Sequence, residues 1–406
     1  MLGELFEIQH ELSRNIDLSF KRYLYETINW DTRLIILTGS RGVGKTTLLL
    51  QYIRERGAAP EEYLYISADN ILVDSHGLFR IASEFHKFGG RVLIIDEIHK
   101  YPDWSRELKN IYDSLPKLNI IVSGSSSLDI IKGRYDLSRR AVLYTLRGLS
   151  FREFLILNLG KDIRQVPLKK ILSNHVEISR DLKETAEKSG RKILRLFTDY
   201  LKFGYYPYYL EGTGDYFIKL NNVMEKVIYE DIPSVFKLKQ TSIPYLKKLI
   251  YLIATSSPFH PNIARISSNL GISKEYVYNY IDYLEKAGLF MFLYPPERGL
   301  RLVRKPEKIY LENTNLYRAI EGDRRFSIES GTVRETFAVN QLKALHAVFS
   351  SEKADLMIDG RYVFEIGGRT KGKKENGGAD DAFILSDGIE TGYAKKIPLW
   401  LLGLLY

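Results

Sequence analysis

The sequence predicts an α/β fold that opens with a parallel sheet covered by helices. Apolar runs separated by helical patterns occupy residues 34–37, 62–66, 91–95 and 119–122, with a fifth candidate at 142–146. Continuous apolar runs rich in β-branched residues are typical of strands buried on both faces of a parallel sheet. A glycine-rich turn follows the first run directly, as in α/β sheets that bind phosphate groups at a helix N-terminus.

Length and periodicity predict four domains. A single hydrophobic core stops growing at about 250–300 residues, so a chain of 406 residues needs more than one. An amphipathic helical lead-in over residues 1–30 opens the first domain, 1–150, and helical periodicity marks the second, 151–236. A helix-turn-helix pattern occupies 237–310, and strand-like segments return in 311–406. The apolar run 399–406 at the end of the chain is expected to be a buried strand.

Composition excludes several classes of protein. With 45% hydrophobic and 27% charged residues the chain is of ordinary globular composition. Its apolar runs are far shorter than the roughly 20 residues that span a bilayer, and the absence of cysteine rules out disulfides and thiolate metal sites. We therefore expect a soluble, cytoplasmic protein without a membrane partner. The net charge of +9 permits a polyanionic partner without requiring one.

A phosphate-binding loop of the form G-x-x-x-x-G-K-[ST] lies between the first predicted strand and a helix. Its residues are Gly39, Ser40, Arg41, Gly42, Val43, Gly44, Lys45 and Thr46, with Thr47 continuing the helix. The glycines let backbone N–H groups surround the phosphates, Lys45 contacts the β- and γ-phosphates, and the Thr46 hydroxyl ligates Mg²⁺. The motif predicts binding of a nucleoside triphosphate with Mg²⁺.

Two acids end the third predicted strand. Asp96 is expected to hold Mg²⁺, and Glu97 to activate the attacking water as the catalytic base. The C-terminal ends of the strands border the crevice in which open α/β sheets bind ligands. The structural alternative is that both acids are solvated and cap the next helix.

Further candidates follow the fourth strand. Ser123 would sense the γ-phosphate or orient water, unless the serines here only cap a helix that begins near Leu128. Arg134, Arg139 and Arg140 are candidates for an arginine finger, which acts within the chain or from a neighbouring copy.

Several short motifs recur in the order found in a known group. They occupy residues 39–46, 95–99, 104–109, 123–126, 137–140, 149–154, 203–207 and 230–232. The chain resembles the archaeal-type predicted ATPases of the AAA+/STAND branch. This resemblance implies a P-loop domain, a helical lid, a winged helix and a small C-terminal α/β nuclease-like domain. It also favours Arg140, which matches the second position of the family's Gly-Arg pair, and it favours ATP. The chain has no N-K-x-D segment, which would read a guanine base, and this also favours ATP over GTP.

The winged-helix prediction rests on residues 262–287. Ser273 would cap the second helix, and Val277, Ile281 and Leu284 would form its buried face. Residues 237–310 contain twelve Lys or Arg and five Asp or Glu, an excess of seven positive charges. The predicted wing carries many of these charges, at Arg298, Arg301, Arg304, Lys305 and Lys308. They would contact double-stranded DNA at its phosphates, and the alternative is a domain used for packing.

The last domain carries three acids in a nuclease-like arrangement: Glu335, Asp355 and Glu365. That chemistry needs a lysine two residues after the last acid, where this chain has Gly367. Lys371 and Lys373 are the nearest substitutes, and we expect the domain to be inactive.

The sequence thus supports three hypotheses. The first is an ATPase switch whose nucleotide state is coupled to a DNA or protein partner, as a single chain or an oligomer. The second is a nucleotide-binding scaffold with negligible turnover. The third is an ATP-dependent nuclease, against which Gly367 argues.

Overall fold

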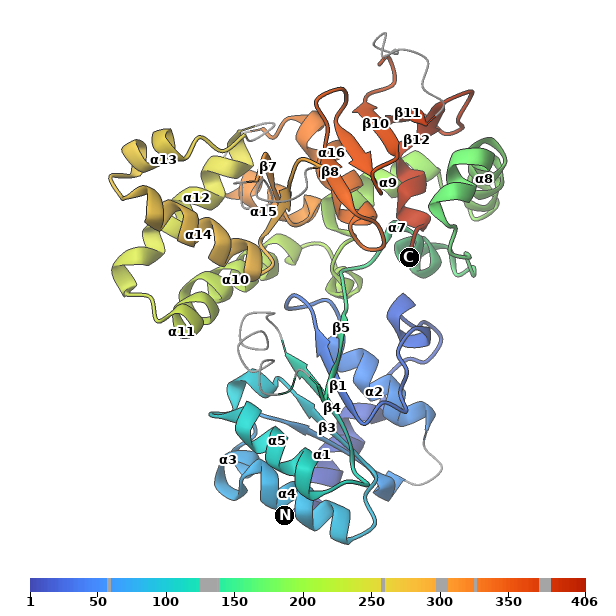
Figure 1. Cartoon of the computed structure of the whole chain (residues 1–406). Coiled ribbons are helices and arrows are strands. Elements are labelled where there is room, and N and C mark those ends of the chain that lie inside the picture. Colours follow the sequence, from blue (N-terminus) through green and yellow to red (C-terminus); the bar gives the residue numbers. More distant parts are fainter. Residues whose placement is uncertain are drawn as a thin grey trace. The chain divides into compact units, whose positions relative to one another are not determined.

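The computed structural model describes residues 1–56, 60–124, 137, 139–256, 260–296, 306–324, 327–371 and 381–406. Two compact units make up the chain, Met1–Gly148 and Leu149–Tyr406. They can be told apart by colour in Figure 1, where the first unit runs from blue to green. The divisions predicted at 236 and 310 fall inside the second unit.

The first unit contains the predicted parallel sheet. Its strands run in the order β2-β3-β4-β1-β5, and all neighbouring strands are parallel. Their bounds are β1 Leu34–Thr38, β2 Tyr63–Ser67, β3 Val92–Asp96, β4 Asn119–Gly124 and β5 Val142–Thr145. The predicted α/β class is confirmed, fifth strand included. Because β4 lies between β1 and β3, its C-terminal end separates the loop after β1 from the acids after β3.

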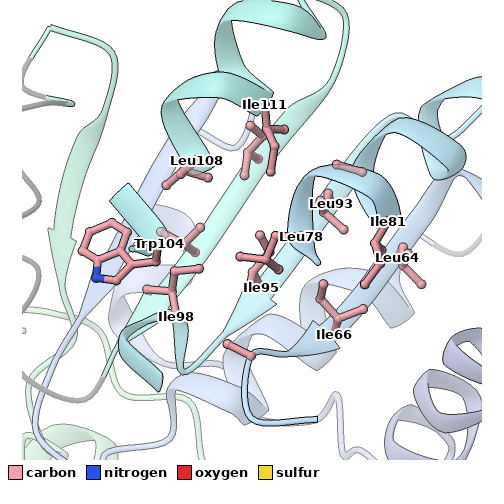
Figure 2. Packing of buried hydrophobic residues seen from close by; sticks show 14 of the residues in the cluster. Leu64, Ile66, Leu78, Ile81, Leu93, Ile95, Ile98, Trp104, Leu108 and Ile111 are labelled. Atoms are coloured by element: carbon pink, nitrogen blue, oxygen red, sulfur yellow. The ribbon is translucent and has the colours of Figure 1, made fainter. Parts of the chain in front are cut away.

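Helices pack against this sheet, and most of them share one continuous apolar core with its strands. They are α1 Leu2–Arg14, α2 Lys45–Glu55, α3 Ile71–His76, α4 Leu78–Lys87 and α5 Trp104–Ser114, with the short turns η1 Tyr23–Glu26, η2 Pro60–Glu62 and η3 Ile98–Lys100. Figure 2 shows Leu93 and Ile95 of β3 packed beneath side chains of α4 and α5. Alternate residues of a strand point to one face, which places Leu93 and Ile95 together. This packing anchors β3 and hence the two acids at its end.

The first part of the second unit, residues 149–236, is helical. Its helices are α7 Phe151–Leu159, α8 Leu168–Lys188, α9 Ile193–Phe203, η4 Pro207–Glu211, α10 Tyr216–Lys226, the π-helical η5 Val227–Asp231, and α11 Ile232–Phe236. A capping box starts α7: the Ser150 side chain accepts from the Glu153 N–H, and the Glu153 side chain accepts from the Ser150 N–H.

The predicted helix-turn-helix is formed by the helices over residues 263–270 and 274–286. After η6 Gln240–Ser242 come α12 Ile243–Thr255, α13 Ile263–Leu270 and α14 Lys274–Lys286, then the antiparallel pair β6 Phe290–Leu293 and β7 Lys308–Leu311. Ser273 caps α14 as predicted, and Val277, Ile281 and Leu284 are buried. The helix-turn-helix residues are thereby confirmed at the level of local structure.

The last segment is a mixed sheet. After α15 Thr314–Arg324 and α16 Ser330–Leu342 come β8 Val348–Ser350, β9 Leu356–Ile358, β10 Tyr362–Gly367, β11 Ala382–Ser386 and β12 Lys396–Pro398. Strands β8, β9 and β10 are antiparallel neighbours, whereas β10, β11 and β12 are parallel.

The prediction of a strand at the end of the chain is wrong. The segment is the 3-10 helix η8 Leu399–Leu404, which is buried. A Cβ on Gly403 would lie 2.3 Å from Phe151 Cβ, so η8 packs tightly on α7. A short run that is apolar on every side has no periodicity that distinguishes a strand from a helix.

Candidate functional site

The loop between β1 and α2 is a tight turn that depends on its glycines. Gly42 and Gly44 have φ angles of 80° and 95°, a region that favours glycine. A Cβ on Gly39 would lie 2.3 Å from the carbonyl oxygen of Leu146, which follows β5. Only glycine therefore fits where the loop passes the neighbouring strand.

Lys45 is the first residue of α2, and its side chain reaches back to the loop. Its Nζ donates hydrogen bonds to the carbonyl oxygens of Gly39 at 2.9 Å and Ser40 at 3.1 Å. Val43 is buried, whereas Thr47 in the first turn of α2 is exposed. The loop therefore gathers an ammonium group and a helix N-terminus, both of which attract phosphate.

Arg22 supports the loop from an irregular segment, and sequence analysis missed it. It is 5% exposed, and its guanidinium donates to the carbonyl oxygens of Val43 and of Arg147, the latter at 2.7 Å. The contact joins the loop to the end of β5. The predicted helical lead-in over residues 1–30 is wrong beyond Arg14, where α1 ends, and Arg22 lies in the irregular part that follows, where no motif indicates this contact.

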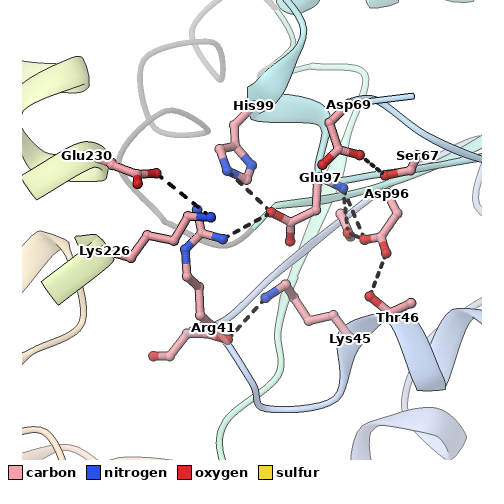
Figure 3. Close-up of polar contacts among 12 residues, drawn as sticks. Arg41, Lys45, Thr46, Ser67, Asp69, Asp96, Glu97, His99, Lys226 and Glu230 are labelled. Carbon is pink, nitrogen blue, oxygen red and sulfur yellow. Dashed lines mark hydrogen bonds and ion pairs between the residues drawn. The ribbon is translucent and has the colours of Figure 1, made fainter. Parts of the chain in front are cut away.

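Asp96 is the centre of a buried hydrogen-bond network at the end of β3. Its Oδ2 accepts from Thr46 Oγ1 at 2.6 Å and from the Tyr65 hydroxyl at 2.8 Å, and its Oδ1 accepts from Ser123 Oγ. Asp96 is 2% exposed. Figure 3 shows its carboxylate pointing toward Thr46. The two residues expected to hold Mg²⁺ are thus in direct contact, although they lie far apart in the sequence.

Glu97 points in another direction, toward His99 and Arg41 (Figure 3). Its Oε2 lies 3.5 Å from His99 Nε2 and 3.7 Å from Arg41 Nη1. The backbone of Glu97 is left-handed, with φ 52°, which is unusual for a residue other than glycine. Among the described residues its side chain makes no capping hydrogen bond to η3. The geometry therefore gives no support to the helix-cap alternative.

Burial raises the pKa of the Glu97 carboxyl above its ordinary value. Lys45 counteracts this shift, Asp96 adds to it, and Arg41 and Lys100 counteract it further. A raised pKa makes a carboxylate a stronger base, and displaced pKa values of this kind cluster at functional sites.

The structure describes two of the candidates that follow the fourth strand. Ser123 is fully buried and donates a hydrogen bond to Asp96. The helix that Ser123 was alternatively expected to cap lies outside the described residues, and so does Arg134. Arg140 makes two contacts with Asp113 of α5, from Nε at 3.0 Å and from Nη2 at 3.1 Å. Its role as an arginine finger stays a prediction.

These residues fit a nucleotide with Mg²⁺. The site combines a loop in which a Cβ on Gly39 would clash, the ammonium group of Lys45, and the hydrogen-bonded pair of the Thr46 hydroxyl and the Asp96 carboxylate. Hard oxygen ligands such as this hydroxyl and carboxylate suit Mg²⁺. In the described part of the chain no cluster of three or more His, Cys, Asp or Glu could hold a metal ion.

The predicted basic surface of the winged helix is only partly described. Arg298, Arg301, Arg304 and Lys305 lie outside the described residues. Lys308 was expected to contact DNA phosphates, and this prediction is wrong. It is 8% exposed on β7, and its Nζ lies 3.1 Å from Glu335 Oε2, so a buried ion pair holds its charge.

Family models match two parts of the chain. Residues 31–155 match an AAA domain. Residues 194–326 match a domain of unknown function. The first match covers the sheet, the loop and both acids. The first unit accordingly has an AAA-type, P-loop ATPase-like fold.

Two archaeal relatives come from Methanocaldococcus jannaschii, and both are uncharacterized proteins. One is 31% identical over 288 residues, which cover 68% of this chain and 60% of the relative. The other is 25% identical over 274 residues, which cover 64% of this chain and 56% of that relative. The chain thus matches less than two thirds of either relative's length.

Solved structures also resemble the chain. A Walker-type ATPase of Pyrococcus abyssi matches with a TM-score of 0.40 and 14% identity, over 77% of this chain and 95% of that one. DnaA of Aquifex aeolicus, solved with AMPPCP, matches with a TM-score of 0.28 and 19% identity, over 70% and 89%. In the part of the chain that is described, no helix is long and apolar enough to cross a membrane.

Proposed function

We propose that the chain binds Mg²⁺-ATP and hydrolyses it, acting as a switch. The observation that carries the proposal is the 2.6 Å hydrogen bond from Thr46 to Asp96 beside the glycine loop. It brings the hydroxyl and the carboxylate that would hold Mg²⁺ to one point, next to the Lys45 ammonium. The AAA-domain match over residues 31–155 supports the same assignment.

Each side chain has one task in this proposal. The N–H groups of the loop and Lys45 would bind the phosphates, and Thr46 and Asp96 would hold Mg²⁺, which would neutralise charge that develops on the phosphoryl oxygens. Ser123 and Tyr65 orient Asp96 through their hydrogen bonds. Glu97 accepts a proton from the attacking water, and its neighbours Arg41 and His99 position its carboxylate.

The partner is proposed to be double-stranded DNA, bound through α14 and the basic residues around it. On α14, Lys274, Tyr276 and Tyr278 are exposed. An ammonium group can contact phosphate, and exposed aromatic rings supply apolar contact area. A protein partner is the alternative, with the same helix used for packing.

The decisive experiment compares hydrolysis by the wild-type chain with hydrolysis by Glu97→Gln. This variant keeps the shape of the side chain and removes the base. General-base catalysis contributes about 100- to 10,000-fold, so we expect turnover to fall by about two orders of magnitude or more while ATP binding is kept. The control is Lys45→Ala, which should lose ATP binding in an equilibrium titration.

A nucleotide-binding scaffold would give a different result. It would bind ATP through Lys45, but wild-type turnover would be no faster than that of Glu97→Gln. That outcome would reject the ATPase and leave the nucleotide site in place.

A further inference from the structure

A lysine ammonium group lies among three oxygen atoms of the C-terminal sheet. Lys371 Nζ lies 3.2 Å from Glu365 Oε1 and 3.5 Å from Asp355 Oδ2, and it donates to the Ile366 carbonyl oxygen at 2.7 Å. Glu365 and Ile366 belong to β10, and Asp355 directly precedes the neighbouring strand β9.

Gly367 makes room for this lysine. It lies two residues after Glu365 on the same strand, so a side chain there would point to the same face of the sheet. A Cβ on Gly367 would lie 2.0 Å from Lys371 Cδ and 2.7 Å from Lys371 Cβ. The stem of Lys371 therefore fills the space that a side chain at position 367 would need. The glycine that breaks the nuclease-like pattern is the residue that admits Lys371. Lys373, the other expected substitute, lies outside the described residues.

The three oxygen atoms are of the kind that bind a hard divalent cation. Carboxylate and carbonyl oxygens are the usual ligands of Mg²⁺, at about 2.0–2.1 Å. An ion bound to the same atoms would lie about 3 Å or less from the ammonium nitrogen, where like charges repel strongly in a poorly solvated site. Glu365 is 9% exposed, so little water screens this repulsion. The ammonium group and a divalent ion therefore exclude each other.

The third acid of the nuclease-like arrangement is also neutralised within the chain. Glu335 of α16 accepts from Lys308 Nζ at 3.1 Å and from the Tyr310 hydroxyl at 2.6 Å. Both side chains of this ion pair are largely buried. Each of the three acids thus has a lysine of the same chain as its counter-ion, an arrangement that needs no metal.

We propose that Lys371 is a built-in cation that occupies the place of a divalent metal ion. The wild-type chain then binds no Mg²⁺ or Mn²⁺ at Asp355 and Glu365, and displacement of the lysine opens a site for one such ion. This inference goes beyond the proposed ATPase: it concerns the other unit and holds whether or not the chain hydrolyses ATP.

The test is a Mn²⁺ titration of the full-length chain without nucleotide. Binding is measured by calorimetry and, independently, by the electron paramagnetic resonance signal of free Mn²⁺. Lys371→Met keeps most of the stem and removes the charge. Gly367→Ala keeps the lysine and all acids but pushes the stem aside. We expect each variant to gain one Mn²⁺ ion per chain, at an affinity at least tenfold above that of the wild type. Addition of Glu365→Gln to either variant should abolish the gain.

A matched control is Lys353→Met, which removes an exposed lysine from the loop before β9 and should gain no site. The proposal is overturned if the wild type already binds one Mn²⁺ ion that Glu365→Gln removes, because metal and lysine would then coexist. It is also overturned if Gly367→Ala, folded by circular dichroism, gains no Mn²⁺. Gly367→Ala decides the question even if Lys371→Met does not fold, and neither result depends on ATP hydrolysis.

Discussion

At the scale of the residue, Asp96 and Glu97 are neighbours with different environments. Asp96 accepts three side-chain hydrogen bonds, from Thr46, Tyr65 and Ser123, which hold its carboxylate in one orientation. Glu97 is buried and has its pKa raised above the ordinary value of 4.5. One acid is thereby suited to hold a cation and the other to accept a proton.

The pH dependence of hydrolysis should report the raised pKa of Glu97. The base works only when ionised, so the turnover number should fall as pH decreases through the pKa of Glu97. Because that pKa is raised, the acid limb should lie at a higher pH than for an unperturbed carboxyl group. Lys100 lowers this pKa, so Lys100→Ala should move the limb upward. A pH–rate profile checks both, and a limb that persists unchanged in Glu97→Gln would assign it to another group.

At the scale of the element, helix caps at Ser150 and Ser273 anchor α7 and α14. Both side chains accept an N–H from the first turn of their helix. Ser150 is fully buried and also donates to a main-chain oxygen of Tyr406 at 2.6 Å, whereas Ser273 is exposed. The same motif therefore has different surroundings in the two helices.

Replacement of each serine should separate these effects. Loss of an N-cap costs about 0.5–2 kcal/mol, and loss of the buried hydrogen bond to Tyr406 leaves an acceptor with one partner fewer. We expect Ser150→Ala to lower the free energy of unfolding by about 2 kcal/mol or more, and Ser273→Ala by about 1 kcal/mol or less. Chemical denaturation measures both. Equal losses would show that the contact with Tyr406 contributes nothing.

A polar cluster around Asn315 of α15 joins helices that lie far apart in the sequence. The Asn315 side chain accepts from the Tyr205 N–H at 2.9 Å and from the Tyr216 hydroxyl at 2.6 Å, and it donates to the carbonyl oxygens of Tyr200 and Leu201. Asn315 is fully buried. All four hydrogen-bonding positions of its amide are used, so it fixes how α15 meets α9 and α10.

At the scale of the whole molecule, a switch requires that the nucleotide site and a partner affect each other. The excess of seven positive charges in residues 237–310 accounts for most of the chain's net +9. Lys308 is not available for DNA because Glu335 neutralises it. Any binding of DNA would therefore rest on the other basic residues of this segment.

Coupling can be measured by ATP hydrolysis with and without saturating double-stranded DNA at low salt. We expect stimulation of several-fold that fades as salt rises, because phosphate contacts release counter-ions. Lys274→Ala should weaken the stimulation, whereas Lys308→Ala should destabilise the fold without changing the salt dependence. Hydrolysis that DNA leaves unchanged would favour a protein partner.

Local sequence patterns were enough to predict the parallel sheet, the glycine loop, the two acids and the capped helix-turn-helix. Each depends on neighbouring residues: the period of apolar side chains, the conformational freedom of glycine, or a hydroxyl at a helix start. The contacts between distant side chains, in contrast, depend on the three-dimensional fold. Tyr65 and Ser123 reach Asp96 because β2 and β4 flank β3. Lys371 reaches its three oxygen atoms because Gly367 leaves space for it. Such contacts depend on strand order and on the volume left by neighbours, which no local pattern records.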